Sequence, residues 1–110
     1  MTQGGPVAQV PAADVPAEAY LLDVREPEEW GAGHAPGAVH IPLGELGARY
    51  TELDQDRPLY VICRSGFRSA QAAQALAGAG WDASNVADGM VGWQAAGLPM
   101  TAESGQPYVA

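Results

Sequence analysis

The feature that most constrains the fold is a continuous apolar run in the middle of the chain, Leu59 to Ile62. A strand with no polar alternation has to be covered on both faces, which is typical of the centre of a parallel sheet. A second run, Tyr20 to Val24, has a similar character and predicts another buried strand. Because helical patterns follow these runs, we expect an α/β fold with a mainly parallel sheet.

Weaker patterns supply the other elements. Short strands are expected over residues 38–41 and 84–86, and helices from Pro27 onward, over 43–50, over 69–79 and over 90–96. In the alanine-rich helix over 69–79, the inward positions at helical spacing are Ala70, Ala73, Leu76 and Ala77. Gly80 can end this helix in the left-handed conformation that glycine adopts without strain.

Length and charge limit what the chain can be and bind. Its 110 residues fit one domain over 1–110, with a core over about residues 7–100 and loosely held polar ends. The net charge of −8 repels phosphate backbones and anionic lipids, so we expect neither nucleic acid nor a membrane as a partner. Residues 1–6 carry no positive side chain and no apolar stretch, so we expect no signal peptide and, by default, a cytoplasmic location.

The chain contains one cysteine, Cys63. An intramolecular disulfide and a zinc site built from several cysteines are therefore excluded, and we expect no metal and no cofactor. Cys63 directly follows the buried strand over 59–62, and open α/β sheets bind their ligands at the carboxyl ends of the strands. The cysteine therefore stands where chemistry is expected.

The residues after Cys63 form a loop suited to an anion. Gly66 at its centre allows a positive φ, so that successive backbone N–H groups can point to one place. Arg64 and Arg68 add positive charge, and the helix that begins near Ser69 adds the positive end of its dipole. These features favour a reactive thiolate at Cys63 over an inert buried thiol.

Four segments together resemble the rhodanese (sulfurtransferase) domain family. They are Leu22 to Trp30, the stretch Gly33-His34-Ala35-Pro36-Gly37-Ala38, the loop Cys63 to Ser69, and Asp88-Gly89-Met90 with Trp93 and Gly97-Leu98-Pro99. They occur in the family's order and spacing over residues 22–99. The resemblance implies a five-stranded parallel sheet that is flanked by helices on both faces.

The resemblance also implies an activity. A member of this family takes a sulfane sulfur from a donor such as the thiosulfate anion onto its cysteine, here Cys63, as a persulfide. It then passes the sulfur to cyanide or to a thiol, and the acceptor can be a protein. The substrate is expected to be bound by the rest of the loop, that is by Arg64, Ser65, Gly66, Phe67, Arg68 and Ser69.

Two residues depart from the family pattern. Ala35 replaces a larger aliphatic residue, which removes some packing, and Asp88 stands where glycine is common. Aspartate tolerates a positive φ better than most residues, so the turn at Asp88 can form. Structural roles, rather than catalytic ones, are expected for the polar residues outside the loop, namely Asp23, Arg25, His34 and His40.

Two other classes of function use a similar loop. A sulfur carrier that delivers a persulfide to a protein partner needs the same cysteine chemistry, and the sequence does not distinguish it from an enzyme. Cysteine phosphatases fit less well, because they place one residue more between cysteine and arginine than the four residues that separate Cys63 from Arg68. Arsenate reductases commonly need a further thiol, which this sequence lacks.

Overall fold

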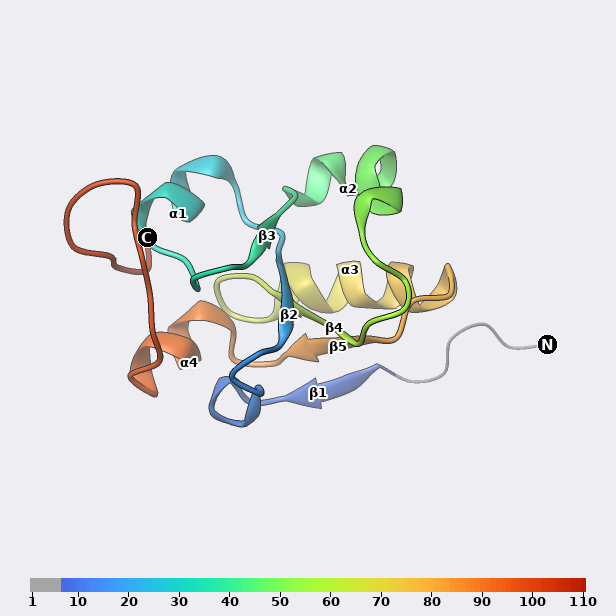
Figure 1. The fold of residues 1–110 in the computed structure, drawn as a ribbon, viewed down its shortest axis with the longest axis horizontal. Coiled ribbons are helices and arrows are strands. Elements are labelled where there is room, and N and C mark those ends of the chain that lie inside the picture. Colours follow the sequence, from blue (N-terminus) through green and yellow to red (C-terminus); the bar gives the residue numbers. More distant parts are fainter. Residues whose placement is uncertain (1–6) are drawn as a thin grey trace.

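A parallel sheet of five strands forms the centre of the molecule in the computed structural model, which describes residues 7–110 (Figure 1). The strands, in the spatial order β1-β5-β4-β2-β3, are β1 (Ala8–Val10), β5 (Ala83–Val86), β4 (Leu59–Ile62), β2 (Tyr20–Asp23) and β3 (Val39–His40). The helices are α1 (Pro27–Ala32), α2 (Leu43–Arg49), α3 (Phe67–Gly78) and α4 (Gly89–Ala95), with 3-10 turns η1 (Ala12–Asp14) and η2 (Tyr50–Glu52). The expected α/β class and five-stranded parallel sheet are confirmed, whereas the expectations for residues 1–6 lie outside the described residues.

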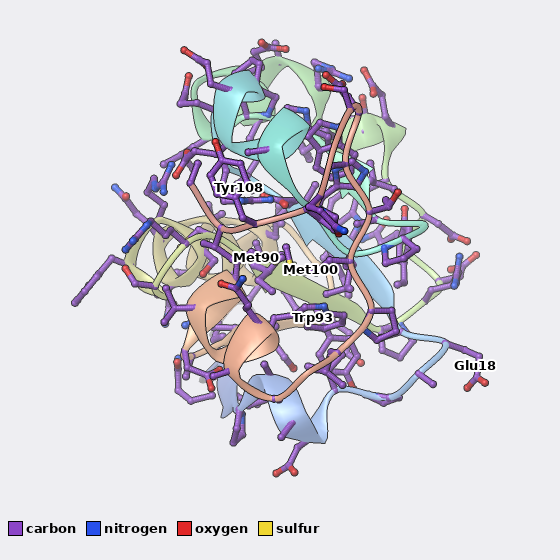
Figure 2. All side chains as sticks on the ribbon, turned by 90° about the vertical axis from the view of Figure 1, so that its left-hand side faces the viewer. Glu18, Met90, Trp93, Met100 and Tyr108 are labelled. Atoms are coloured by element: carbon purple, nitrogen blue, oxygen red, sulfur yellow. The ribbon has the colours of Figure 1, made fainter. Side chains whose placement is uncertain are left out.

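The two central strands divide their side chains between two cores. On β4, Leu59 and Val61 pack toward α2 and α3, and Cys63, directly after the strand, points to the same face. Ile62 points the other way, toward η1 and α4. Figure 2 looks onto the α4 end of this second core, where Met90, Trp93 and Met100 lie below Tyr108. Burial on both faces explains why β4 reads as an uninterrupted apolar run.

Helix α3 starts two residues earlier than the sequence predicts. Gly66 adopts a φ of 103° and caps the helix, which therefore begins at Phe67 instead of Ser69. The expected inward position of Ala70 is wrong, because the buried stripe consists of Ser69, Ala72, Ala73, Leu76 and Ala77. The expected end of the helix is confirmed, since Gly80 follows it with a φ of 105°.

Strand β1 is the element that the patterns along the chain do not indicate. It is three residues long and mostly exposed, and it pairs with β5, far away in sequence, so that Gln9 lies opposite Asn85. Its edge position leaves little apolar signal in the sequence. The weak strand expected over 84–86 is present as β5 and begins one residue earlier.

The turn before α4 differs from the expectation at Asp88. This residue has an ordinary φ of −101°, and the positive φ falls on Gly89, at 59°. Asp88 instead accepts a hydrogen bond from the N–H of Ala12 at 2.8 Å, which ties η1 to the start of α4. The aspartate is therefore accommodated by its side-chain bond and not by its tolerance of a left-handed backbone.

The last ten residues run beside α1 (Figure 1). Thr101 pairs with His34 in an isolated antiparallel bridge, and the N–H groups of Glu103 and Tyr108 donate to the carbonyls of Gly31 and Ala32. This segment, for which the sequence predicts a loose hold, thus makes regular backbone hydrogen bonds. No helix within residues 7–110 has the length and apolarity needed to cross a bilayer.

Candidate active site

Cys63 lies at the carboxyl end of β4, in the first position of a tight loop. Its side chain is only 1% exposed. The loop turns back at Gly66, whose N–H donates a hydrogen bond to Sγ of Cys63 at 3.1 Å. From the first turn of α3, the hydroxyl of Ser69 lies 3.2 Å from the same sulfur. Strand, loop and helix together place hydrogen-bond donors around one sulfur atom.

These donors affect the acidity of the thiol. Burial raises the pKa of Cys63, but the hydroxyl and N–H of Ser69 and the N–H groups of Gly66 and Ser65 lower it by more, so that the pKa is lowered overall. The physical cause is that hydrogen bonds to an anion stabilise it, whereas a dry environment penalises it. A thiol with a lowered pKa supplies more thiolate at neutral pH, which is the nucleophilic form.

Two glycines make the loop possible. A Cβ on Gly66 would collide with the carbonyl of Ala87, and one on Gly89 would lie 2.5 Å from the carbonyl oxygen of Arg64. Both residues have positive φ, which side chains rarely tolerate. Behind the loop, the N–H of Met90 donates to the carbonyl of Cys63 at 2.8 Å. The backbone at the start of α4 therefore packs directly against the backbone of the loop.

Asn85 of β5 joins the site as a residue that the sequence analysis missed. It is 2% exposed, and its Oδ1 lies 2.6 Å from the hydroxyl of Ser69. Its Nδ2 donates to the carbonyl of Gly66 at 3.2 Å and to Oε1 of Gln9 at 2.8 Å. The signal available in the sequence was that Asn85 is an amide inside an expected strand, where a buried polar group needs hydrogen-bond partners.

The two loop arginines are held in different ways. Arg68 donates to both carboxylate oxygens of Glu29 in α1, at 2.7 and 2.9 Å. This contact raises the pKa of Arg68 and lowers that of Glu29, and the Arg68 charge also interacts with Cys63. Arg64 is exposed and donates to the carbonyl oxygen of Ala110 at 3.0 Å. Binding of a substrate by either side chain stays a prediction.

The remaining expected loop residues lie at the rim. Phe67 is 84% exposed, and Ser65 is exposed as well. Gly66 and Ser69, by contrast, contact the sulfur directly. The loop thus separates into an inner set that touches Sγ and an outer set that is exposed to solvent.

A second group of polar residues supports the site from β2 and α1. Arg25 and Asp23 are fully buried and form an ion pair at 2.7 Å, and Arg25 also donates to the carbonyls of Glu29 and Gly33. His34 and His40 stack on the two sides of one aromatic ring, that of Trp30, and each contacts a backbone carbonyl. These contacts agree with the expected structural roles. In the part of the chain that the structure describes, no three metal-ligating side chains come together.

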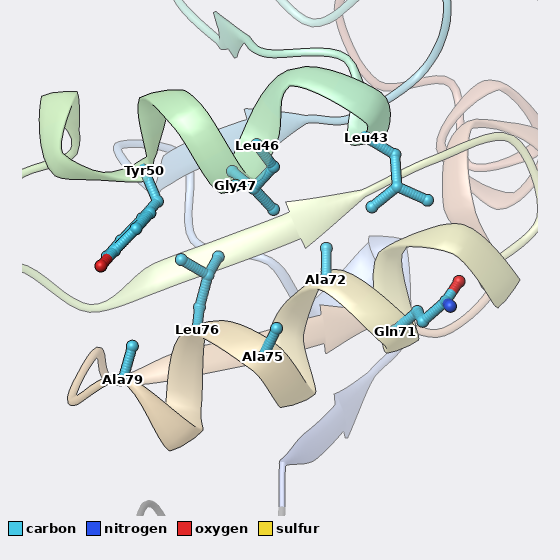
Figure 3. A pocket seen from close by; sticks show the side chains of 9 residues that line it. All are labelled: Leu43, Leu46, Gly47, Tyr50, Gln71, Ala72, Ala75, Leu76 and Ala79. Carbon is cyan, nitrogen blue, oxygen red and sulfur yellow. The ribbon is translucent and has the colours of Figure 1, made fainter.

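An apolar hollow lies elsewhere, between α2 and α3 (Figure 3). Its volume is about 340 Å³, and its lining includes neither Cys63 nor the loop residues 64–69. It is lined by Leu43, Leu46, Gly47, Tyr50, Gln71, Ala72, Ala75, Leu76 and Ala79. This groove is therefore separate from the cysteine loop at the sheet edge.

Comparison with known proteins agrees with this geometry. The family model described as "Rhodanese-like domain" matches residues 9–96. The chain is 43% identical over 77 residues to the putative sulfurtransferase YtwF of Bacillus subtilis, covering 70% of this chain and 75% of that protein. It is 47% identical over 74 residues to the putative sulfur carrier protein YrkF of the same organism, covering 66% of this chain and 40% of that protein.

Solved structures give the same picture. A rhodanese-related protein from Thermoplasma volcanium superimposes with a TM-score of 0.81 and 33% identity, covering 86% of this chain and 97% of that one. A thiosulfate sulfurtransferase from Pseudomonas aeruginosa superimposes with a TM-score of 0.77 and 28% identity, covering 94% of this chain and 22% of that one. Several relatives are longer proteins, and this chain spans about two fifths of the length of YrkF.

Proposed function

This chain belongs to the rhodanese-like domain family, and from that membership we propose that it takes a sulfane sulfur onto Cys63 as a persulfide and passes it to an outside acceptor. The observation that carries the proposal is the ring of donors around one buried sulfur: the N–H of Gly66 at 3.1 Å and the hydroxyl of Ser69 at 3.2 Å. A sulfur with a lowered pKa is suited to nucleophilic attack.

The loading step is a displacement on sulfur. The Cys63 thiolate attacks the outer sulfur of a thiosulfate-like donor, a new S–S bond forms, and the donor's S–S bond breaks. Sulfite leaves with the electron pair of the broken bond, and the negative charge stays on the terminal sulfur of the persulfide. The exposed Arg64 at the rim supports an anionic donor, because it supplies positive charge in a chain of net charge −8.

The discharge step regenerates the thiolate. Cyanide or a thiolate acceptor attacks the terminal sulfur, and the bond to Sγ breaks so that Cys63 departs as the leaving group with its electron pair. Thiocyanate or a new persulfide is the product. Because the sequence has one cysteine, no second thiol of the same chain can resolve the persulfide as a disulfide. A cytoplasmic location fits this chemistry, since thiols stay reduced there.

A carrier that serves a protein partner is the second candidate. Two exposed apolar residues favour it: Phe67, which is 84% exposed, and Val91, which is 44% exposed and whose N–H donates to the carbonyl of Arg64 in the loop. Apolar side chains beside a reactive group suit contact with a protein. The name of the relative YrkF points the same way for that protein. Rapid turnover with thiosulfate and cyanide supports the enzyme, whereas a stable persulfide that turns over only with a protein thiol supports the carrier.

The intact mass of the protein tests the shared chemistry. Incubation with thiosulfate is expected to add the mass of one sulfur atom, and later addition of cyanide is expected to remove it. The Cys63→Ser variant, treated in parallel, is expected to keep its mass throughout. A protein whose mass does not change with thiosulfate or with a small-molecule persulfide does not carry out this reaction.

A further inference from the structure

The hydroxyl of Ser69 lies between two possible acceptors in a dry site. Sγ of Cys63 is 3.2 Å away on one side and Oδ1 of Asn85 is 2.6 Å away on the other. Ser69 is fully buried, and the other two residues are at most 2% exposed. A hydroxyl has one hydrogen to donate, so it can bond to only one of these two acceptors at a time.

The orientation of the Asn85 amide follows from its neighbours. The carbonyl of Gly66 can only accept a hydrogen bond, and it lies 3.2 Å from Nδ2 of Asn85. Rotating the amide would bring Oδ1 against this carbonyl, two acceptors face to face. Nδ2 therefore stays toward Gly66 and Gln9, and Oδ1 stays toward Ser69. Because Oδ1 accepts only, Ser69 has to be the donor in this 2.6 Å bond.

The charge of the sulfur decides which acceptor is better. A thiolate is an anion, and a hydrogen bond to an ionised group is roughly twice as strong as one between neutral groups. A neutral sulfur, by contrast, is a weak acceptor compared with an amide oxygen. In the persulfide the charge lies on the terminal sulfur, so Sγ is neutral there as it is in the thiol.

We propose that Asn85 is a positioning residue that takes the Ser69 hydrogen whenever Sγ is uncharged and gives it up when Sγ becomes a thiolate. The hydroxyl then turns once in each half-reaction, toward Asn85 on loading and toward Cys63 on discharge. Asn85 keeps a buried hydroxyl satisfied in the loaded enzyme, and so shifts the balance from the thiolate toward the persulfide. The statement about the persulfide rests on the proposed function, whereas the position of the hydroxyl in the thiol and thiolate does not.

The other charged side chains near the sulfur are all carboxylates and guanidinium groups. They are Arg64 of the loop, Arg68 of α3 with its partner Glu29, the buried pair Asp23 and Arg25 beside β2, and Asp88 before α4. Carboxylates and guanidinium groups do not change charge in the range where a thiol titrates. A change of alkylation rate with pH between about 6 and 10 therefore reports Cys63.

The test is a double-mutant cycle read out by alkylation with iodoacetamide against pH. Ser69→Ala removes the hydroxyl, and Asn85→Leu removes its second acceptor. We expect Ser69→Ala to raise the midpoint by less than about 0.5 pH unit in the wild-type protein and by about 1 unit in the Asn85→Leu background. Asn85→Leu alone is expected to lower the midpoint, because the hydroxyl then bonds to the thiolate without giving up an amide.

Asn85→Leu also removes the hydrogen bond to the carbonyl of Gly66. Both proteins that carry Asn85→Leu lack this bond, so it does not contribute to the difference between their midpoints. Ser84→Ala, next to Asn85 on the same strand, is the matched control and is expected to leave the midpoint unchanged. Equal shifts from Ser69→Ala in the two backgrounds would overturn the proposal. If the Asn85→Leu proteins do not fold, a rise of about 1 unit or more from Ser69→Ala in the wild type overturns it by itself.

The outcome is independent of the sulfur-transfer activity. Alkylation needs no sulfur donor, so a chain that formed no persulfide would still show whether Asn85 and Ser69 are coupled. Conversely, a protein that loads and discharges sulfur with equal shifts in both backgrounds keeps the proposed function and loses this inference.

Discussion

The carboxylate of Glu29 accepts two hydrogen bonds from the guanidinium of Arg68, at 2.7 and 2.9 Å, and so ties α1 to the first turn of α3. Glu29 is also the N3 residue of a capping box at the start of α1, in which it accepts a bond from the N–H of the N-cap residue Glu26. One carboxylate thereby caps α1 and neutralises one of the two positive charges that the loop brings to the site.

The first prediction follows from this neutralisation. Glu29→Gln keeps the shape of the side chain and removes its charge, so the positive charge of Arg68 acts on an arriving anion without opposition. We expect kcat/KM for thiosulfate to rise about threefold or more, and the rise to shrink at high salt. Glu28→Gln is the control: it removes the same charge from the neighbouring residue, whose side chain is exposed and does not contact Arg68. It should have a smaller effect on kcat/KM. Equal gains in the two variants would mean that general charge repulsion, and not Arg68, is responsible.

A second prediction concerns the nucleophile. Cys63→Ser replaces the only thiol of the sequence with a hydroxyl of similar size, so the fold should persist while sulfur loading and turnover are lost. Circular dichroism checks the fold, and release of thiocyanate from thiosulfate and cyanide checks turnover. Activity that survives in this variant contradicts the mechanism.

The pH dependence of the thiol gives a third prediction. Because the pKa of Cys63 is lowered, the thiolate should become the main form at a pH lower than the ~8.5 at which an ordinary thiol titrates. Alkylation should slow as the pH falls through that lowered pKa. The rate of reaction with iodoacetamide between about pH 5 and 10 measures this. A midpoint at or above the ordinary value would show that burial outweighs the hydrogen bonds of the loop.

Gly66 and Gly78 allow a matched test of the loop, since both stand at α3. Gly66→Ala forces a side chain into a φ of 103° and against the carbonyl of Ala87. We expect it to destabilise the fold by about 1–3 kcal/mol and to slow sulfur loading strongly. In Gly78→Ala the added Cβ has no neighbouring side chain or distant backbone within 4 Å. Because alanine is the better helix former, this variant should stabilise the fold by about 0.5–1 kcal/mol. Urea unfolding of both variants gives the two free energies, and destabilisation of similar size in both would contradict the strained-glycine argument.

The fate of the bound sulfur is the subject of the fifth prediction. With no second cysteine in the sequence, the loaded enzyme should persist after the donor is removed and should discharge at a rate first order in added thiol until saturation. Mass spectrometry of the persulfide over time, with and without a small thiol, measures both rates. Fast loss that does not depend on the thiol would point to hydrolysis or to a disulfide between two chains.

The parts of the candidate site that are formed by residues close together in the sequence could be predicted from it. The apolar run of β4, the cysteine that follows it and the glycine that bends the loop stand within eight residues, from Leu59 to Gly66, and their arrangement could be predicted. The start of α3 was misplaced by two residues, because the left-handed Gly66 already serves as the cap. Local rules thus located the candidate nucleophile and most of its backbone donors.

The parts that could not be predicted depend on distant pairings. Asn85 reaches the site because β5 lies beside β4, and its amide donates to Gln9, which is 76 residues away in sequence. Glu29 meets Arg68 across 39 residues. In the sequence, a polar side chain that makes such a long-range contact cannot be distinguished from a polar side chain that is exposed at the surface.

The bond from Arg64 to the carbonyl oxygen of Ala110 has a consequence for protein engineering. The segment that leads to it is fixed to α1 by the N–H groups of Glu103 and Tyr108, so a module fused after Ala110 would start beside the mouth of the loop. A tethered acceptor domain attached there through a short flexible linker would present its thiol to Cys63 at an effective concentration on the order of millimolar. Sulfur relay within one fused polypeptide would then outcompete small thiols whose concentration is well below that value.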